Sequence, residues 1–443
     1  MMVLKNATVL SLNPAGVESG VDVVIDGPVI LSVGKGAGSS AIAGGTAKIL
    51  DCTGRIVMPG LVCSHNHFYS ALSRGIMARI PPADDFVSTL ANLWWRLDLA
   101  IDREILAASA DVAAVEAIRA GCTAVVDHHA SPSFITGSLD VLRDGFRKAG
   151  LRGVLCYETT DRNGARGADE GIEENRRFAA QAEKDRETLG SARLVEAMIG
   201  GHAPFTLPDG ALRELGDLVR ATGRGFHVHA AEDAFDPSFS HRVHGADVLE
   251  RLDGFGLVTE KTVVAHGVYL SEKDRGILNA RDGFLVHNCR SNMNNRVGYN
   301  GRLPEVKNAA LGTDGIGSDM LEELKFAYFK HRDAGGPLSP ADFVRFLHNG
   351  NALLGRAFGE KFGQVGGGFM ADLTVLSYDP PTPLAPENAA GHAVFGMTGG
   401  SVETVIVGGR IVMENRRFPF DVSGLFENAR RAAAQLWAKM DML

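Results

Sequence analysis

The sequence predicts an α/β protein, a (β/α)8 TIM barrel with a small β-sandwich built from both chain termini. Two observations support this fold class. Short apolar runs alternate with helical patterns through the middle of the chain, and β-rich stretches of similar texture stand at its two ends. The length of 443 residues also suits a barrel with an accessory module better than one small domain.

The candidate barrel strands are short, apolar and rich in β-branched residues, as expected for parallel strands buried on both faces. Eight such runs alternate with helices, which favours a closed barrel over an open doubly wound sheet. No GxGxxG follows the early strands, which disfavours a dinucleotide fold. The runs are LVCSH (61–65), TAVVDH (123–128), RGVLCYE (152–158), RLVEAMIG (193–200), GFHVHA (225–230), TVVAH (262–266), FLVHN (284–288) and AALGTD (309–314).

The connections carry helix and loop signals. DREILAASADVAAVEAIRAG is a helical pattern with Asp102 as its N-cap and Gly121 as its stop. The long connection at 68–101 contains RIPPADDF and LWWRLD, which predicts a lid or a binding loop. Trp94 and Trp95 in this loop either stack on a flat ligand or simply pack.

The terminal stretches predict a second module. Strand-like runs broken by turn signals fill residues 1–57 and return in 362–418. Neither part is large enough to fold alone, so we expect one sandwich made from both. The barrel then occupies 58–361, and an amphipathic helix closes the chain in 419–443.

Composition excludes several classes of function. The formal net charge is −8 and no basic run gathers, so neither nucleic acid nor a membrane surface is an expected partner. The five cysteines are scattered without a CxxC, which argues against a disulfide framework or a zinc knuckle. No secretory signal or membrane-length apolar run is evident, so we expect a cytoplasmic location.

Polar residues end several of the predicted strands, where barrel enzymes place their catalytic groups. His65 and His67 end the first strand, His229 the fifth, His266 the sixth and Asp314 the eighth. Residues i and i+2 of a strand point the same way, so both imidazoles of His65-Asn66-His67 can reach one ion. The HxH pair alone is weak evidence. Glu232, three residues after His229, adds a carboxylate beside such an ion, or it only stabilises a helix N-terminus.

Several motifs in this order resemble the amidohydrolase superfamily over nearly the whole chain. They are PGLVCSHNHFYSALSRG, HVHAAED, VVAHGVYL, FLVHNCRSNM and LGTDG. The resemblance is greatest to its aminohydrolase and chlorohydrolase branch, which includes cytosine, guanine and S-adenosylhomocysteine deaminases. Within that branch, LWWRLDLAID, VVDHHASPS and ADLTVLSYDPPTPL are similar to the SsnA-like aminohydrolases.

The resemblance implies roles for the strand-end residues. It makes His65, His67, His229 and Asp314 the metal ligands, Glu232 the proton shuttle, and His266 a partner of the hydrolytic water or the substrate. His202 would face the substrate, and Arg290, Ser291 and Asn292 would contact it. Binuclear relatives carry a lysine at the end of the fourth strand, which RLVEAMIGGHAP lacks, so one divalent metal is expected, Zn or Fe(II).

The implied reaction is hydrolytic removal of ammonia from an amino-substituted nitrogen heterocycle such as a purine, pterin or pyrimidine. A bound divalent cation would lower the pKa of water towards about 7 and supply the nucleophile. The alternatives are a chlorohydrolase, a cyclic amide hydrolase and a catalytically idle barrel. We expect a small-molecule substrate and a homo-oligomer. Of His128 and His129, at most one faces the pocket, because adjacent strand residues point oppositely.

Overall fold

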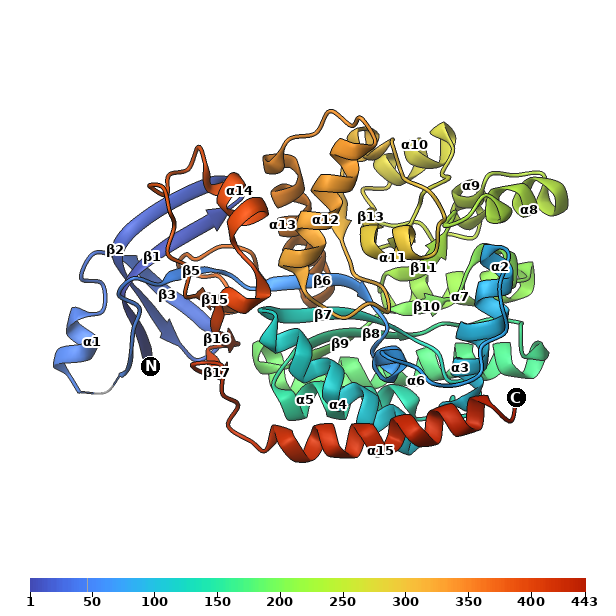
Figure 1. The fold of residues 1–443 in the computed structure, drawn as a ribbon, viewed down its shortest axis with the longest axis horizontal. Helices are drawn as coiled ribbons and strands as arrows, with labels where there is room; N and C mark the ends of the chain where they lie inside the picture. Colours follow the sequence, from blue (N-terminus) through green and yellow to red (C-terminus); the bar gives the residue numbers. More distant parts are fainter. Residues whose placement is uncertain (46) are drawn as a thin grey trace.

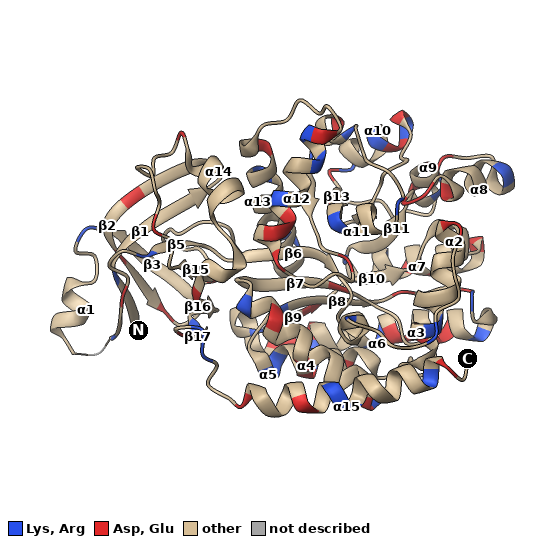
Figure 2. Cartoon of the chain, viewed as in Figure 1, with Lys and Arg blue, Asp and Glu red and all other residues tan. Residues whose placement is uncertain are grey.

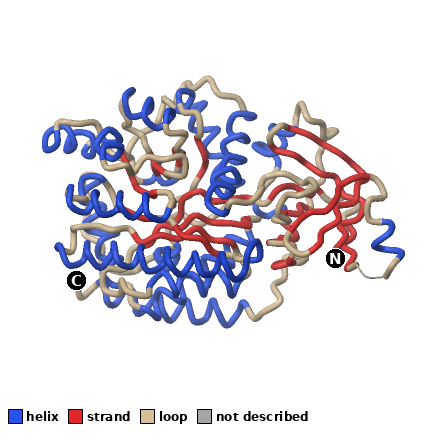
Figure 3. The backbone as a smooth tube through the Cα atoms, turned by 180° about the vertical axis from the view of Figure 1, so that it is seen from behind, coloured by secondary structure: helices blue, strands red, loops and turns tan. Residues whose placement is uncertain are grey.

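The computed structural model describes residues 1–45 and 47–443, and it is an α/β protein with parallel sheets. A β-rich part built from the two chain ends lies beside a larger part in which helices surround the parallel strands (Figure 1). The reverse view shows the same arrangement, with strands inside the larger part and helices around them (Figure 3).

Strands from both ends of the chain share one eight-stranded sheet, in the order β17-β16-β15-β5-β1-β2-β3 with β4 beside β1. The junction between the two ends is β5, which runs parallel to β1 and antiparallel to β15. The strands are β1 (Met2–Leu12), β2 (Ala15–Asp26), β3 (Val29–Gly34), β4 (Lys48–Asp51), β5 (Ile56–Pro59), β15 (Leu373–Leu376), β16 (Val402–Val407) and β17 (Arg410–Met413).

The central strands form two parallel sheets, in the orders β6-β7-β8-β9 and β10-β11-β12-β13-β14. They lie where the sequence predicts them, with one difference described below. Their bounds are β6 (Leu61–Asn66), β7 (Cys122–His129), β8 (Arg152–Tyr157), β9 (Val195–Ala197), β10 (Ile199–Gly201), β11 (Phe226–Ala230), β12 (Val263–His266), β13 (Phe284–His287) and β14 (Ala309–Leu311).

The fourth predicted strand, RLVEAMIG, is interrupted. It divides at Met198 into β9, which pairs with β8, and β10, which pairs with β11. The Met198 N–H donates to the Leu155 carbonyl at 2.9 Å, so the chain stays beside β8 across the break. The side-chain oxygen of Asn175 accepts a hydrogen bond from the Gly200 N–H at 3.2 Å and another from the Tyr157 N–H at 3.0 Å. Asn175 therefore pairs backbone N–H groups that an uninterrupted strand would pair with its neighbours.

Two isolated parallel bridges join the sheets at the carboxyl ends of their strands. One pairs Asn66 with Asp314, and the other pairs Thr159 with Gly201. The first is supported by backbone hydrogen bonds from Thr313 and Asp314 to the His65 carbonyl, at 3.0 and 3.1 Å. The end of β6 and the segment after β14, which lie at the outer edges of the two sheets, thus meet beside His65 and Asp314.

Helices separate the parallel strands, and the helix predicted between Asp102 and Gly121 is present as α4. The side chain of Asp102 caps α4 by accepting from the Ile105 N–H at 2.9 Å, and Gly121 follows with φ of 92°. The helices are α1 (Ser39–Ala43), α2 (Phe86–Thr89), α3 (Trp95–Ala100), α4 (Arg103–Arg119), α5 (Ser138–Ala149), α6 (Gly164–Leu189), α7 (Asp209–Thr222), α8 (Phe235–His244), α9 (Val248–Gly254), α10 (Glu272–Ala280), α11 (Cys289–Asn294), α12 (Met320–Asp333), α13 (Pro340–Phe358), α14 (Ala389–Gly391) and α15 (Val422–Met440).

The long connection after β6 is folded into short helical turns rather than an open loop. It contains the 3₁₀ turn η1 (Phe68–Ser73), α2, the π-helical turn η2 (Leu90–Trp94) and α3. The C-terminal helix α15 packs against α3 and α4, and Trp437 Nε1 donates to the Leu72 carbonyl at 3.3 Å. The closing helix therefore packs against both ends of this connection, at η1 and at α3.

Apolar side chains from the parallel strands fill a common interior cluster together with the end of α13. It includes Val62, Val126, Val154, Val263 and Val286, all fully buried. Between the two parts of the molecule, the buried Arg152 pairs with Asp372 at 2.6 Å. Acidic and basic residues are interspersed over the helices (Figure 2), and no helix of the described residues is long and apolar enough to span a membrane.

Candidate metal and catalytic site

Three histidines predicted from the strand ends turn their Nε2 atoms towards Asp314. His67 Nε2 lies 2.8 Å from Asp314 Oδ1, and His65 Nε2 lies 3.4 Å from the same oxygen. His229 Nε2 is 3.2 Å from His67 Nε2. The ring centroids of these histidines are about 5 Å apart, at 4.8, 5.0 and 5.2 Å. Four side chains that are far apart in sequence therefore converge on one point.

The other ring nitrogen of each histidine has its own partner, which fixes the ring. His65 Nδ1 lies 2.8 Å from His227 Nε2, and His67 Nδ1 lies 2.5 Å from the His128 carbonyl. His229 Nδ1 lies 3.0 Å from the His202 carbonyl. When Nδ1 donates to these acceptors, the lone pair is left on Nε2, which is the tautomer that a metal-binding imidazole requires.

Asp314 is held by an unusual backbone and by several donors. It lies just after β14 with φ of 54°, in the left-handed region that few non-glycine residues adopt. Ser291 Oγ donates to its second oxygen, Oδ2. Burial opposes ionisation of Asp314, but the facing imidazoles of His65 and His67 outweigh burial and hold its pKa well below the usual range. Asp314 is thus an anion surrounded by imidazoles.

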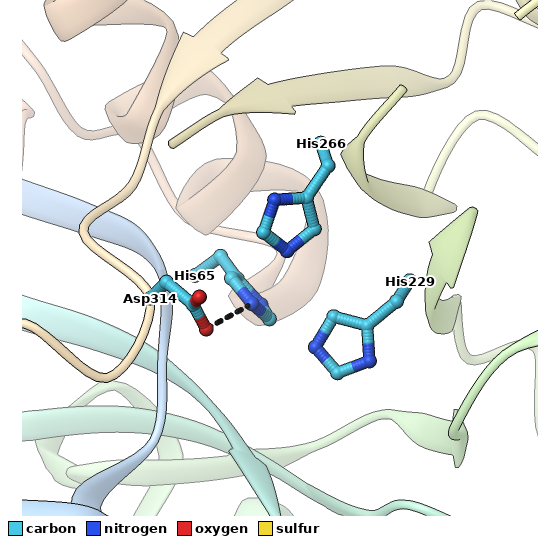
Figure 4. Close-up of side chains that lie close together, drawn as sticks. All are labelled: His65, His229, His266 and Asp314. Atoms are coloured by element: carbon cyan, nitrogen blue, oxygen red, sulfur yellow. Dashed lines mark ion pairs between the residues drawn. The ribbon is translucent and has the colours of Figure 1, made fainter. Parts of the chain in front are cut away.

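This donor set fits a divalent metal. His65 Nε2 and His266 Nε2 are buried without a hydrogen-bond partner among the described residues, although buried polar atoms are normally paired. One candidate set of ligands consists of His65, His229, His266 and Asp314, whose ligand atoms all lie within 4.8 Å of one another (Figure 4). His67 belongs to a second such set, with His128, Glu158 and His229. Three imidazole nitrogens and a carboxylate are the ligands of zinc and of other borderline cations.

Glu232 and His266 lie side by side next to this point. His266 Nε2 is 3.6 Å from Glu232 Oε2, and Asn295 donates to the other Glu232 oxygen at 3.3 Å. His266 ends β12 with φ of 69°, and its Nδ1 lies 2.8 Å from Asn292 Oδ1. Burial raises the pKa of Glu232, which suits a carboxyl group that must deliver a proton near neutral pH.

The converging residues form one end of a cavity of about 760 Å³, counted with its open mouth. His67, His229, Glu232, His266 and Asp314 line this end. The walls carry flat and apolar side chains from the long connection and from the segments after β10 and β11, namely Tyr69, Phe86, Leu90, Trp94, Trp95, Phe205 and Phe235.

A second polar group lies elsewhere on the cavity wall, and sequence reasoning missed it. Arg162 donates to Glu158 at 2.9 Å, lies 3.5 Å from Asp98 Oδ2, and stacks 5.0 Å from the centre of the Trp95 ring. Glu158 also pairs with His128 at 3.2 Å. Glu158 directly follows β8, and the rule that polar strand ends face the site would have identified it.

Of the other residues predicted to contact the substrate, some line the cavity and some do not. His202 lines the cavity, with its Nδ1 2.8 Å from Thr206 Oγ1. Asn292 is buried behind His266 and is not among the lining residues. Arg290 also lies outside the lining, because its guanidinium pairs with Glu322 and Glu323. Of the two adjacent histidines, His128 pairs with Glu158, and His129 Nε2 lies 2.8 Å from Ser131 Oγ.

The chain belongs to the amidohydrolase family, whose model matches residues 56–412. It is 30% identical over 403 residues to the 5-methylthioadenosine/S-adenosylhomocysteine deaminase of Thermococcus onnurineus, covering 89% of this chain and 90% of that protein. It is 29% identical over 391 residues to the 5'-deoxyadenosine deaminase of Methanopyrus kandleri, covering 86% of both chains. This membership makes the chain a hydrolase of the class that acts on carbon–nitrogen bonds.

A solved structure shares the fold over nearly the full length. The zinc-bound adenosine deaminase of Xanthomonas campestris superposes with a TM-score of 0.84, at 23% identity, over 99% of this chain and 98% of that one. At this identity the similarity establishes the fold alone.

Proposed function

We propose that this protein is a metal-dependent hydrolytic deaminase whose substrate is an adenine nucleoside or a closely related amino-substituted ring. The single observation that carries the proposal is the convergence of three histidine Nε2 atoms on Asp314, with Glu232 and His266 beside them in an aromatic-walled cavity. Relatives named as deaminases of 5'-deoxyadenosine and of 5-methylthioadenosine support the substrate class.

We assign His65, His67, His229 and Asp314 as the ligands of one divalent cation, with zinc as the first choice and Fe(II) as the alternative. His67 is preferred to His266 as a ligand because its Nε2 is 2.8 Å from Asp314 Oδ1 and its Nδ1 is held by a backbone carbonyl. When bound, the cation supplies a nucleophile at neutral pH by lowering the pKa of water.

The remaining side chains divide the proton transfers between them. Asp314 accepts a proton from the attacking water. Glu232 would deliver its proton to a ring nitrogen so that electron density can leave the attacked carbon. It would then take up the proton that Asp314 accepted, pass it to the departing amine, and recover a proton from the added hydroxyl group as the new carbonyl forms. His266, whose Nδ1 donates to Asn292 Oδ1, presents Nε2 to the same point and, when Nε2 also carries a proton, stabilises the charge that develops in the tetrahedral intermediate. Protonation of the leaving group matters for ammonia and much less for chloride, so Glu232 favours deamination over dechlorination.

The next feature is the closure of the two parallel sheets. We propose that the two parallel sheets form one closed barrel through the Asn66–Asp314 and Thr159–Gly201 bridges, with β9 and β10 as one interrupted strand. The barrel spans 58–361, and the shared terminal sheet forms the β-sandwich of 1–57 and 362–418. The protein is expected to be a homo-oligomer, which size-exclusion chromatography with light scattering will test.

The test of this function is a substrate panel with metal analysis. Protein reconstituted with zinc is incubated with 5'-deoxyadenosine, 5-methylthioadenosine, guanine, a pterin and cytosine, and ammonia is measured together with the deaminated ring. We expect release of one ammonia per inosine-type product from the adenine nucleosides. Absence of ammonia from every member of the panel, in protein that contains about one metal per chain, would exclude the proposal.

A further inference from the structure

One wall of the cavity is carried by η2 and α3, in the long connection after β6. Leu90, Trp94 and Asp98 line the cavity at a spacing of four residues, so they share one face of this helical segment. Arg96 lies two residues from Trp94 and Asp98 and therefore does not share that face. Its guanidinium donates instead to the Met440 carbonyl, at the end of α15. The segment thus connects the cavity wall to the C-terminal helix.

Arg96 holds three parts of the chain together. Besides the Met440 carbonyl, its guanidinium donates to the Arg79 carbonyl at 2.8 Å and to the Asn92 carbonyl at 3.2 Å. Asp441 contacts the same residue of the connection, since its carboxylate accepts from the Arg79 N–H at 2.6 Å. Both backbone groups of Arg79 are therefore bound, one by the wall segment and the other by the end of α15.

The segment 76–85 has little else to fix its position. All of it is described by the structure, and it forms no helix or strand. Pro81 and Pro82 have no N–H to donate. The side chains of Met77 and Ile80 are 76% and 38% exposed, so burial contributes little at these positions. A segment of this kind takes its position from the few hydrogen bonds that hold it.

The last turns of α15 also contact the beginning and the end of the connection. Trp437 donates to the Leu72 carbonyl at 3.3 Å, in η1, and Lys439 pairs with Asp102, which directly follows the connection. We call residues 437–441 the strap. Among the described residues that line the cavity, none belongs to the strap.

We propose that the strap positions the cavity wall through Arg96 and Asp441, so that substrate affinity depends on residues that do not touch the substrate. The metal ligands come from strand ends, and neither Arg96 nor Asp441 contacts them, so the strap should affect KM rather than kcat. This kinetic consequence rests on the proposed function, because it is measured with a nucleoside. The effect on the segment 76–85 does not.

The first test measures steady-state kinetics of Asp441→Ala with 5'-deoxyadenosine. Loss of the hydrogen bond from Arg79 to a charged acceptor should raise KM about tenfold, with kcat within about threefold of the wild type and metal content unchanged. Asp441→Asn keeps an acceptor oxygen and should restore most of the affinity. Glu427→Ala, at an exposed position of α15, is the matched control and should behave as the wild type. A wild-type KM in Asp441→Ala, or a fall in kcat instead, overturns the proposal.

Arg96→Met tests whether the two residues act through the same segment. Methionine is an unbranched side chain without a donor, so KM should again rise about tenfold. If both residues hold the wall through Arg79, the Arg96→Met/Asp441→Ala double variant should raise KM by clearly less than the product of about 100-fold, because residues that share a partner are not additive. Full multiplication of the two effects would mean that they act independently and contradicts the strap.

A third measurement needs no turnover. Trypsin can cut after Arg79, whose side chain is exposed, but the backbone there must first leave its hydrogen bonds. In Asp441→Ala and Arg96→Met this cut should be about tenfold faster, whereas the cut after Arg166, a 91% exposed side chain of α6, is the internal control. Faster cutting without deamination of any nucleoside would refute the function and support the strap. Unchanged cutting in a variant that deaminates with wild-type KM would refute the strap and support the function.

Discussion

The cavity holds two clusters of polar side chains, one around Asp314 (the metal end) and one around Arg162 (the Arg162 group), and different kinds of element carry them. At the metal end, His67, His229 and His266 come from the ends of β6, β11 and β12, and backbone carbonyls or buried side chains hold their second nitrogens. At the other group, Trp95 and Asp98 come from α3 in the long connection, and Arg162 comes from the segment after β8.

This difference assigns separate tasks to the two groups. Reacting atoms must be held within a fraction of an ångström, which strands of a packed sheet can do. Substrate recognition tolerates adjustment, and connections between elements supply it. Changes at the metal end should therefore alter kcat, and changes at the Arg162 group should alter KM.

The largest effect is expected at Asp314. Asp314→Asn removes the anion to which His65 and His67 turn, so metal content and activity should be lost together, with kcat falling to the background rate. Metal analysis of the purified variant and an ammonia assay measure both quantities. A variant that kept a full metal complement and its turnover would remove Asp314 from the site.

Glu232→Gln should separate metal binding from proton transfer. The side chain keeps its size and its contact with Asn295, so metal content should stay near that of the wild type. Loss of the transferable proton should lower kcat by roughly 10²–10⁴-fold, the usual contribution of general acid–base catalysis. Turnover within a few-fold of the wild type would show that another group shuttles the proton.

Asn292→Ala removes the partner that orients His266. Loss of such a supporting hydrogen bond typically lowers activity by roughly 10–100-fold, and we expect the loss in kcat at unchanged metal content. Asn294→Ala, at an exposed position of the same helix, is the control and should behave as the wild type. Equal activity of the two variants would mean that His266 needs no orientation by Asn292.

At the Arg162 group, Arg162→Lys keeps the charge and loses the planar stack on Trp95. Because lysine does not replace a stacked, forked guanidinium, KM should rise by about tenfold, while kcat should stay within about threefold of the wild type. Steady-state kinetics with 5'-deoxyadenosine measure both constants. A fall in kcat without a change in KM would reverse the division of tasks.

The smallest effect is expected outside the cavity. Asp102→Ala removes the cap of α4 and should lower the free energy of unfolding by about 1 kcal/mol without changing kcat or KM. Asp102→Asn restores a capping oxygen and should recover most of this stability. Urea denaturation followed by circular dichroism compares the three proteins. Equal stability of the alanine variant and the wild type would show that the Asp102 cap contributes nothing.

Much of the fold was predictable because local physics decides it. Asp102 begins α4 and the pattern VSGLFENARRAAAQLWAKM forms α15, since caps and amphipathic periodicity act within a few residues. The break at Met198 was not predictable. RLVEAMIG has the composition of one strand, and only its two different neighbours, β8 and β11, divide it.

In the candidate site, too, the sequence indicates what is local, and distant contacts decide the rest. The strand-end positions of His65, His67, His229, His266 and Asp314 can be picked out because polar residues at the ends of apolar strands are conspicuous in a sequence. Their roles follow from the resemblance and stay predictions. Arg290 and Asn292 were chosen by resemblance, and their directions depend on contacts that the sequence does not show: Arg290 pairs with Glu322 and Glu323, and Asn292 supports His266.

The amino-acid sequence by itself determined the alternation of strands and helices, their caps, and the strand ends that carry imidazole and carboxylate groups. Only the tertiary structure decided which of these groups share a cavity and how Arg162 is neutralised. The reason is that propensity and periodicity act over a few residues, whereas the orientation and charge environment of a side chain are set by segments far away in the chain.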